Sequence, residues 1–438
     1  MLSIIGLITI LIVVVLLISG KVSPFVGLLL VPIGGAFAAG FNLEQIGEFF
    51  TSGTQSVFSV VVMFIFAIIF FGIMQDVGVF DPLINKMIAL TRGNVIAVAV
   101  GTVIIAAIAQ MDGSGASTFL ITIPALLPLY KRLKMNPYLL LMLVGTSASI
   151  VNMVPWGGPL GRVAAVLEMD VTELWRPLIQ IQLIGLVLLV VLAVALGYRE
   201  KRLIAKRVGE FGKTDDMESV VSDKEPQTKK AEGKPKFYWL NVALAISVIA
   251  VLVWGIIPAG FAFMIGVSIA LPINYPNIQD QMGRIQAHAP GAILMATIIL
   301  AAGSFLGILN GTEMLTSIAT DLVTILPAFV IPYLHIIIGV FGVPFDLLLS
   351  TDAYYFALFP IVEQIVTDFG VSSLSAAYAM IIGNIIGTFV SPLSPALWLA
   401  LGLAGLEMGK HIRYSFMMMW GFSIVLLAIA IAMGVIVL

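Results

Sequence analysis

Two acidic residues, Asp112 and Asp352, stand among small, polar and apolar residues in a sequence that is otherwise poor in charge. A carboxylate at the depth of a lipid bilayer costs about 2.5 to 3.5 kcal/mol on insertion scales, which suggests that it has a use. We predict that Asp112 and Asp352 bind the coupling proton or cation, and that they are also the candidate ligands of a metal ion. An aspartate before Gly or Ala is also a good helix cap, and both roles can coexist.

Short hydrogen-bond donors gather near these aspartates and in two later stretches rich in Pro and Gly, residues 145–159 and 383–395. Arg162 follows the first stretch, and its planar guanidinium matches a carboxylate through two hydrogen bonds. The alternative role for Arg162 is to reach the membrane interface. One hydroxyl can merely satisfy a helix backbone, so the prediction depends on the clustering. The predicted substrate-binding residues are Ser114, Gly115, Ser117, Thr118, Asn152, Trp156, Gly157, Gly158, Arg162, Thr351, Asn384, Thr388, Ser391 and Ser394.

Asp346 and His335 precede Asp352 by a short distance in the sequence and are candidates for a proton path. The alternative for His335 is a structural hydrogen bond, which is the more common role of a buried histidine. Neither residue belongs to the predicted substrate-binding set.

Long apolar segments must position these residues, because 60% of the 438 residues are hydrophobic and only 11% are charged, against roughly 25% in soluble domains. Runs such as 2–20, 57–74, 178–197 and 415–438 each approach the roughly 20 residues that span a bilayer as a helix. The first run lacks a basic start and a cleavage pattern, so we expect a retained helix and no signal peptide. The absence of cysteine excludes disulfides, and the net charge of −2 gives no sign of a nucleic-acid partner.

A charged segment, residues 198–238, separates two halves of nearly equal length, 1–197 and 239–438. Its first part contains Arg199, Lys201, Arg202, Lys206 and Arg207, and basic residues stay on the cytoplasmic side of a membrane. The sequence therefore predicts a cytoplasmic linker at 198–238 in a bacterial inner-membrane protein whose N- and C-termini both lie outside.

Each half contains one long apolar segment with like-charged flanks. Residues about 94–130 have basic flanks, and residues about 322–367 have acidic flanks. Both ends of the first segment are therefore expected on the cytoplasmic side of the membrane, and both ends of the second on the outer side. We interpret them as re-entrant hairpins, with two short full spans each as the alternative. Interrupted helices are expected at about 138–167 and 374–405. The predicted fold is an all-α polytopic membrane protein with two inverted repeats, each of five transmembrane helices plus one re-entrant hairpin.

Weak similarity between the halves supports this prediction, because residues 71–76 resemble residues 306–311. Irregular backbone at membrane depth is tolerated where it is buried in protein or lines an aqueous cavity. Four such breaks in two symmetric pairs therefore predict one shared central site. Broken helices direct free N–H groups and the positive ends of their dipoles into such a gap, which favours an anionic substrate.

Three motifs, residues 110–122, 128–133 and 154–162, resemble the citrate-metal complex:proton symporter family, CitMHS, and the resemblance extends over the whole chain. It implies a transporter, not an enzyme, that takes up citrate complexed with Mg²⁺ or Ca²⁺ by proton symport. It also implies a homodimer and an elevator-type movement of the hairpin region. One departure affects the metal preference: the family pattern Asp-Gly-Asp-Gly is replaced here by Asp112-Gly113-Ser114-Gly115.

Other functions remain possible at this point. A sodium-coupled carrier of di- or tricarboxylates or of gluconate would share the fold, and an imposed sodium gradient would distinguish it. A channel would also fit the hydropathy, although inverted halves favour alternating access. An intramembrane aspartyl protease would pair two membrane carboxylates, but neither Asp112 nor Asp352 has the expected Gly-x-Gly-Asp context.

Overall fold

The computed structural model describes residues 1–19, 21–79, 81–82, 94–211, 237–327 and 329–437, and every regular element in these ranges is helical. Among the described residues, five helices are long and apolar enough to cross a membrane, and many shorter apolar helices accompany them. The chain is therefore an all-helical polytopic membrane protein. The five long segments are Phe58–Asp76, Val95–Asp112, Val171–Lys206, Ile278–Gly311 and Met408–Ala432.

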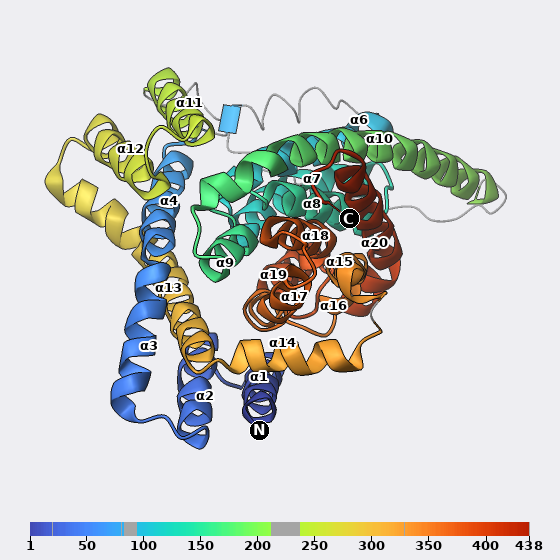
Figure 1. Cartoon of the computed structure of the whole chain (residues 1–438). Helices are drawn as coiled ribbons and strands as arrows, with labels where there is room; N and C mark the ends of the chain where they lie inside the picture. Colours follow the sequence, from blue (N-terminus) through green and yellow to red (C-terminus); the bar gives the residue numbers. More distant parts are fainter. Residues whose placement is uncertain (20, 80, 83–93, 212–236, 328, 438) are drawn as a thin grey trace.

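The helices form two groups, and each group draws on both halves of the sequence (Figure 1). We call the first group the arm bundle. The long helix α13 packs against α2, α3 and α4, while α1 packs against α2 and α14. Its helices are α1 (Leu2–Ser19), α2 (Pro24–Ala38), α3 (Leu43–Ser56), α4 (Phe58–Asp76), α11 (Tyr238–Trp254), α12 (Ala259–Asn274), α13 (Ile278–Gly311) and α14 (Met314–Ile325).

The second group, the core bundle, lies beside α13 and above α14 in Figure 1. Its elements are α6 (Val95–Ala109), η1 (Gln110–Asp112), α7 (Gly115–Arg132), α8 (Pro137–Val151), α9 (Gly158–Val166), α10 (Val171–Phe211), η2 (Ile331–Tyr333), α15 (Leu334–Val340), α16 (Gly342–Phe345), the π-helical η3 (Ala353–Leu358), α17 (Phe359–Thr367), α18 (Ser373–Ile385), η4 (Ile386–Phe389), α19 (Pro395–Ala404) and α20 (Met408–Ala432).

Polar residues at the helix starts explain where several elements begin. Asn94, Ser114, Asn136 and Ser372 each accept a hydrogen bond from a backbone N–H of the first turn of α6, α7, α8 and α18. Such caps satisfy donors that have no partner inside the helix. The predicted hairpin at 94–130 and the predicted broken helix at 138–167 are occupied by α6, η1 and α7 and by α8 and α9.

Two predicted boundaries differ from the structure. The first part of the predicted linker, residues 198–211, is helical and continues α10, because this stretch is rich in helix-favouring Arg, Lys, Glu, Leu and Ala. Glu200 is buried there and accepts a hydrogen bond from the backbone N–H of Asn136 at 2.8 Å. Residues 322–325 belong to α14, which ends before Pro327, because the residue before a proline avoids the helical conformation. Most of the predicted linker, residues 212–236, lies outside the described residues.

Close helix contacts hold the arm bundle together. Gly53 of α3 faces α13, and a Cβ atom added to Gly53 would lie 2.1 Å from the carbonyl oxygen of Gly303 and 2.7 Å from the Cα of Gly307. Gly72 of α4 faces α13 further along, where an added Cβ would lie 2.4 Å from Nδ1 of His288. Gly53 thus lets the backbones of α3 and α13 approach closely, and Gly72 leaves room for the imidazole of His288.

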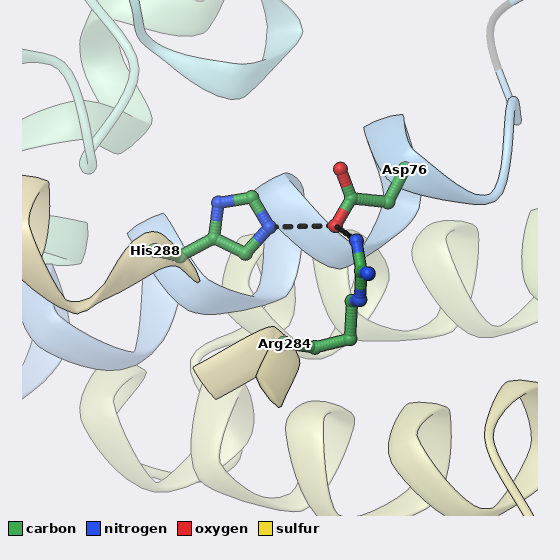
Figure 2. Close-up of polar contacts among 3 residues, drawn as sticks. All are labelled: Asp76, Arg284 and His288. Atoms are coloured by element: carbon green, nitrogen blue, oxygen red, sulfur yellow. Dashed lines mark hydrogen bonds and ion pairs between the residues drawn. The ribbon is translucent and has the colours of Figure 1, made fainter. Parts of the chain in front are cut away.

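One ionic contact follows this packing near the end of α4. Figure 2 shows Asp76 of α4 between two side chains of α13. Its Oδ2 atom lies 2.8 Å from Nε2 of His288 and 3.4 Å from Nη1 of Arg284. Arg284 is 44% exposed and Asp76 is 27% exposed, so we expect this cluster to contribute modestly to stability.

Candidate functional site

In each half, residues of the predicted interrupted helix pack against residues of the predicted hairpin of the other half. Helix α9 contacts η3, α19 contacts α7, and η4 contacts α8. The aromatic rings of Phe119 in α7 and Phe389 in η4 meet edge to face with their centroids 5.1 Å apart. The two halves are therefore interleaved in the core bundle, where the irregular segments lie.

Glycines permit the break between α8 and α9. A Cβ atom on Gly157 would lie 2.0 Å from the carbonyl oxygen of Asn152, so the chain can fold back on itself only with glycine at this position. A Cβ atom on Gly158 would lie 2.6 Å from Nη1 of Arg162, so the small residue leaves room for the guanidinium. The second break separates η4 from α19 and includes Ser391 and Ser394.

A cavity of about 620 Å³ lies at the second break and is open on one side. It joins three regions of the sequence: the α1–α2 connection, Arg162 of α9, and the second-half segments around Asp352 and Ser394. Its lining residues are Lys21, Val22, Ser23, Pro24, Arg162, Asp346, Ser350, Thr351, Asp352, Thr388, Ser391, Leu393, Ser394 and Pro395. Residues of both the arm bundle and the core bundle thus line one cavity, and its wall includes charged and hydroxyl side chains.

An ion pair between the two halves lies in this wall. Nε of Arg162 donates to Oδ1 of Asp352 at 2.7 Å, and the two side chains are only 10% and 12% exposed. The guanidinium carbon also lies 5.9 Å from the centre of the Phe356 ring. Arg162 is therefore buried within the protein and paired with Asp352.

Positive helix ends add to the character of the cavity. The first residues of α2, Ser23 and Pro24, and those of α19, Ser394 and Pro395, belong to the lining. Helix N-termini carry partial positive charge and free N–H groups, which suit an anionic ligand. Lys21 brings a further ammonium group to the same wall.

The structure brings together six of the predicted site residues, five from the substrate-binding set and one of the two coupling carboxylates. Arg162, Thr351, Thr388, Ser391, Ser394 and Asp352 line the cavity. Ser391 also donates to the backbone carbonyl of Asp346, and its own hydroxyl accepts from the N–H of Leu393. Thus the second half of the predicted site forms one surface, together with Arg162.

The first-hairpin residues lie outside the cavity lining and interact among themselves. Oδ1 of Asp112 accepts the backbone N–H of Ser114 at 2.8 Å, which closes a turn ahead of α7. Ser114 in turn caps α7 through the N–H of Ser117. Gly115 lies against Phe389, where an added Cβ would come within 2.6 Å of the ring.

A buried amide connects the first hairpin with the first break. Thr118 donates to Oε1 of Gln110 at 2.6 Å, and Nε2 of Gln110 donates to Oδ1 of Asn152 at 3.4 Å. Trp156 donates from Nε1 to the carbonyl of Met111 and stacks on Phe71 of α4 with centroids 4.8 Å apart. Trp156 and Asn152 thus fix the break against the hairpin tip and the arm bundle instead of lining the cavity.

Two other candidates from the sequence also lie away from the lining. Asn384 donates to the carbonyl of Gly342 at 3.1 Å, which ties α18 to the second hairpin. His335 is fully buried in α15 and lines no part of the cavity. Asp346, in contrast, is 2% exposed and does line it.

Sequence reasoning missed the contribution of the α1–α2 connection and of Ser350. Lys21 and Ser23 stand between two apolar runs and resemble an ordinary loop, so no local signal marks them as site residues. Ser350 directly precedes Thr351 and could have been found from that position. Among the described residues, no group of three or more His, Asp and Glu side chains is placed to hold a metal ion.

Comparison with known proteins decides the family. The family model described as citrate transporter, CitMHS, matches residues 4–383. The chain belongs to this family. It is a transporter and not an enzyme, which confirms the resemblance found in the sequence and excludes the protease alternative. Similar curated proteins of Bacillus subtilis (strain 168) are a "Citrate transporter", 35% identical over 100% of both chains, and a "Mg(2+)/citrate complex secondary transporter", 34% identical over 100% of this chain and 99% of the relative.

Solved structures resemble the fold at low sequence identity. The Alcanivorax borkumensis YdaH transporter aligns over 90% of both chains with a TM-score of 0.59 and 14% identity. Neisseria gonorrhoeae MtrF aligns over 88% of this chain and 82% of its own, again with a TM-score of 0.59 and 14% identity. At this identity the likeness supports a shared transporter fold and nothing about substrate.

Proposed function

We propose that this family member is a secondary transporter of citrate in complex with a divalent cation such as Mg²⁺ or Ca²⁺. The buried Arg162–Asp352 pair in the cavity wall is the observation that carries the proposal. One partner can bind a carboxylate and the other can bind a cation, so the pair offers complementary contacts to a substrate that contains both. The names of the two curated relatives support the same substrate class.

Binding would exchange partners within this pair. The guanidinium of Arg162 turns from Asp352 to a citrate carboxylate, and the Asp352 carboxylate turns to the metal ion, which prefers oxygen ligands. Each buried charge then keeps a partner throughout. Free citrate would take Arg162 but leave Asp352 unpaired, and leaving a buried charge unpaired is costly. This exchange explains why a metal complex would be preferred to free citrate.

The net charge of the cavity agrees with a weakly anionic substrate. Its lining has two basic residues, Lys21 and Arg162, and two acidic residues, Asp346 and Asp352, so the formal charges cancel. Citrate has three carboxylates, and a divalent cation leaves the complex with a single negative charge. The N-termini of α2 and α19 suit that remaining charge. The hydroxyl groups of Ser350, Thr351, Thr388 and Ser394 are the proposed hydrogen-bonding partners of the complex.

The transport is proposed to be driven by protons, with sodium as the alternative coupling ion. The sequence assigns the coupling site to Asp112 and Asp352, and both remain candidates in this proposal. Asp352 lines the cavity, whereas Asp112 lies at the tip of the first hairpin. A gluconate-type or other carboxylate carrier with sodium coupling is the second candidate function, because the fold alone does not distinguish it.

The proposed architecture is a pair of inverted repeats, residues 1–197 and 239–438, and helix contacts support it. An offset of 235 residues, which takes Phe71 to Leu306, takes Gly72 to Gly307 and Gly53 to His288. The contact between Gly72 and His288 then corresponds to the contact between Gly307 and Gly53, and both contacts exist. Such reciprocal contacts arise when equivalent helices of two repeats pack antiparallel across a pseudo-two-fold axis.

An elevator-type movement would shift the core bundle against the arm bundle. The cavity wall contains arm-bundle residues Lys21–Pro24 and core-bundle residues of η4 and α19, so such a shift would open and close it. We propose a homodimer in a bacterial inner membrane, with both termini outside and the linker 198–238 in the cytoplasm. The basic residues at the start of that linker support the orientation.

The test uses purified protein in liposomes loaded with citrate, with uptake of labelled citrate as the readout. Exchange is expected to increase on addition of Mg²⁺ or Ca²⁺, and an inward proton gradient is expected to drive accumulation. A sodium gradient that drives uptake in place of the proton gradient would favour the second candidate function. Absence of citrate exchange under all these conditions would overturn the proposed substrate.

A further inference from the structure

Three carboxylates near the two breaks differ in the hydrogen-bond and ion-pair partners that surround them. Asp112 receives the backbone N–H of Ser114, and Asp352 receives the guanidinium of Arg162. The Oδ2 atom of Asp346 is buried and has no hydrogen-bond partner. Asp346 is therefore the carboxyl group whose charge the surrounding protein does not satisfy.

The surroundings of Asp346 are confined and lack a basic partner. Its Oδ2 atom lies against η4, where a Cβ atom added to Gly387 would come within 2.2 Å of it. Asn384 of α18 is the side chain that interacts with it, and Ser391 contacts its backbone carbonyl instead of its carboxyl group. Tyr354 and Tyr355 of η3, both fully buried, are titratable groups beside it, and the charged groups Lys21, Arg162 and Asp352 line the same cavity. Among the described residues, Asp346 forms no ion pair within 4 Å.

An ionised Asp346 would leave a buried carboxylate oxygen without a hydrogen-bond donor. Burial of an unpaired charge is far more costly than burial of a neutral polar group, so the neutral, protonated form suits this structure. The first hairpin arm, Val95–Ala109, contains no acidic residue and forms a helix without one. A carboxyl group at this depth is therefore unnecessary for building a hairpin arm, which points to a function in transport.

We propose that Asp346 is the proton-binding residue of the transport cycle. It holds one proton on its carboxyl group in the conformation described here, and it releases that proton to water when movement of the second hairpin hydrates the site on the other side. No bond other than the O–H bond forms or breaks. The inference rests on the proposed function, because it assigns the coupling proton of that transport to one residue.

Charge provides the link between proton and substrate. With Asp346 neutral, the cavity lining has the charges of Lys21, Arg162 and Asp352, which sum to one positive charge. That sum complements the single negative charge of a metal–citrate complex. Binding of the complex then favours binding of the proton, and the proton favours the complex by the same factor, as linkage requires.

The test compares wild-type protein with the D346N variant in liposomes, because asparagine resembles a protonated aspartate in size and charge. Each pH unit of gradient gives about a tenfold accumulation for each coupled proton. D346N is expected to keep citrate counterflow within about twofold of wild type, about 0.4 kcal/mol on the same scale, and to lose the pH-driven accumulation. An entrapped pH dye is expected to show citrate-dependent proton entry in wild type and none in D346N.

The D368N variant is the matched control, because Asp368 is an exposed acidic residue beyond α17, and it is expected to keep proton entry. Citrate-dependent proton entry that persists in D346N would overturn the proposal, as would its loss in D368N alone. If D346N does not fold, infrared difference spectra of wild type still decide: a protonated carboxyl band is expected in the citrate-bound protein, and its absence overturns the proposal. Wild-type citrate exchange driven by sodium and not by pH would overturn the proton assignment while leaving the citrate substrate intact.

Discussion

Replacing Asp352 with asparagine tests the exchange of partners in the cavity, and we expect the metal dependence of citrate binding to fall. Nε of Arg162 lies 2.7 Å from Oδ1 of Asp352, and both side chains are nearly buried. Two charges about 4 Å apart interact by about 4 kcal/mol at the effective dielectric constant of a protein surface. In wild type, free citrate must displace Asp352 without giving it a new partner, whereas the metal complex supplies one. The neutral amide of the D352N variant has no charge to satisfy, so this difference between the two forms of citrate disappears.

The magnitude follows from that interaction. If only a third of the roughly 4 kcal/mol distinguishes free citrate from its complex, the ratio of the two dissociation constants changes about tenfold. The assay is calorimetric titration of the purified protein with citrate alone and with citrate plus excess Mg²⁺. The D368N variant is the control, because Asp368 is an exposed acidic residue beyond α17 and should leave the ratio unchanged. An unchanged ratio in D352N, with intact binding, would refute the idea that Asp352 meets the metal.

Three further predictions concern single residues. The G158A variant places a methyl group against the guanidinium of Arg162, and we expect citrate binding to weaken at least about tenfold. The control is G402A, whose added methyl group meets no other atom and which should bind citrate normally in the same titration. The G53A variant forces a methyl group into the backbone of α13 and should destabilise the arm bundle by about 1 to 3 kcal/mol in thermal unfolding, whereas G47A, which meets nothing, should be neutral or slightly stabilising. The D76N variant removes the shared partner of the two α13 side chains in Figure 2. Because Asp76 is partly exposed, we expect the free energy of unfolding to fall by less than about 1 kcal/mol. A larger fall would show that the cluster does more than join two helices.

The helical membrane architecture could be predicted from the sequence because the bilayer restricts the possible structures. Apolar runs, caps such as Asn94 and Asn136, and breaks such as Gly157 all act within a few residues, so their consequences can be predicted locally. The continuation of α10 beyond Gly197 could not be predicted locally, because the composition of residues 198–211 suggests a polar linker. There the burial of Glu200 against the start of α8, a long-range contact, offsets the polarity of the segment.

The candidate site could also be predicted only in part, because it depends on long-range contacts that no local sequence pattern reveals. The clustering of hydroxyl groups points to the second break, where Thr388, Ser391 and Ser394 line the cavity. The first hairpin has equally suggestive residues, but Ser114 caps a helix and Thr118 holds Gln110. A polar side chain in an apolar run can satisfy the backbone or bind a ligand, and its type does not distinguish the two. Only the packing of one half against the other decides which polar side chains line the cavity.

The ion pair between Arg162 and Asp352 shows that the two halves of the sequence contribute different charges to one site. The basic partner comes from the first half and the acidic partner from the second, and Asp346 adds a further acid from the second half. Either half alone would bury uncompensated charge at this depth, so the halves depend on each other electrostatically as well as sterically. A substrate with both a cation and carboxylates can replace both partners at once, and free citrate can replace only one. The contact between Arg162 and Asp352 would therefore select the metal complex.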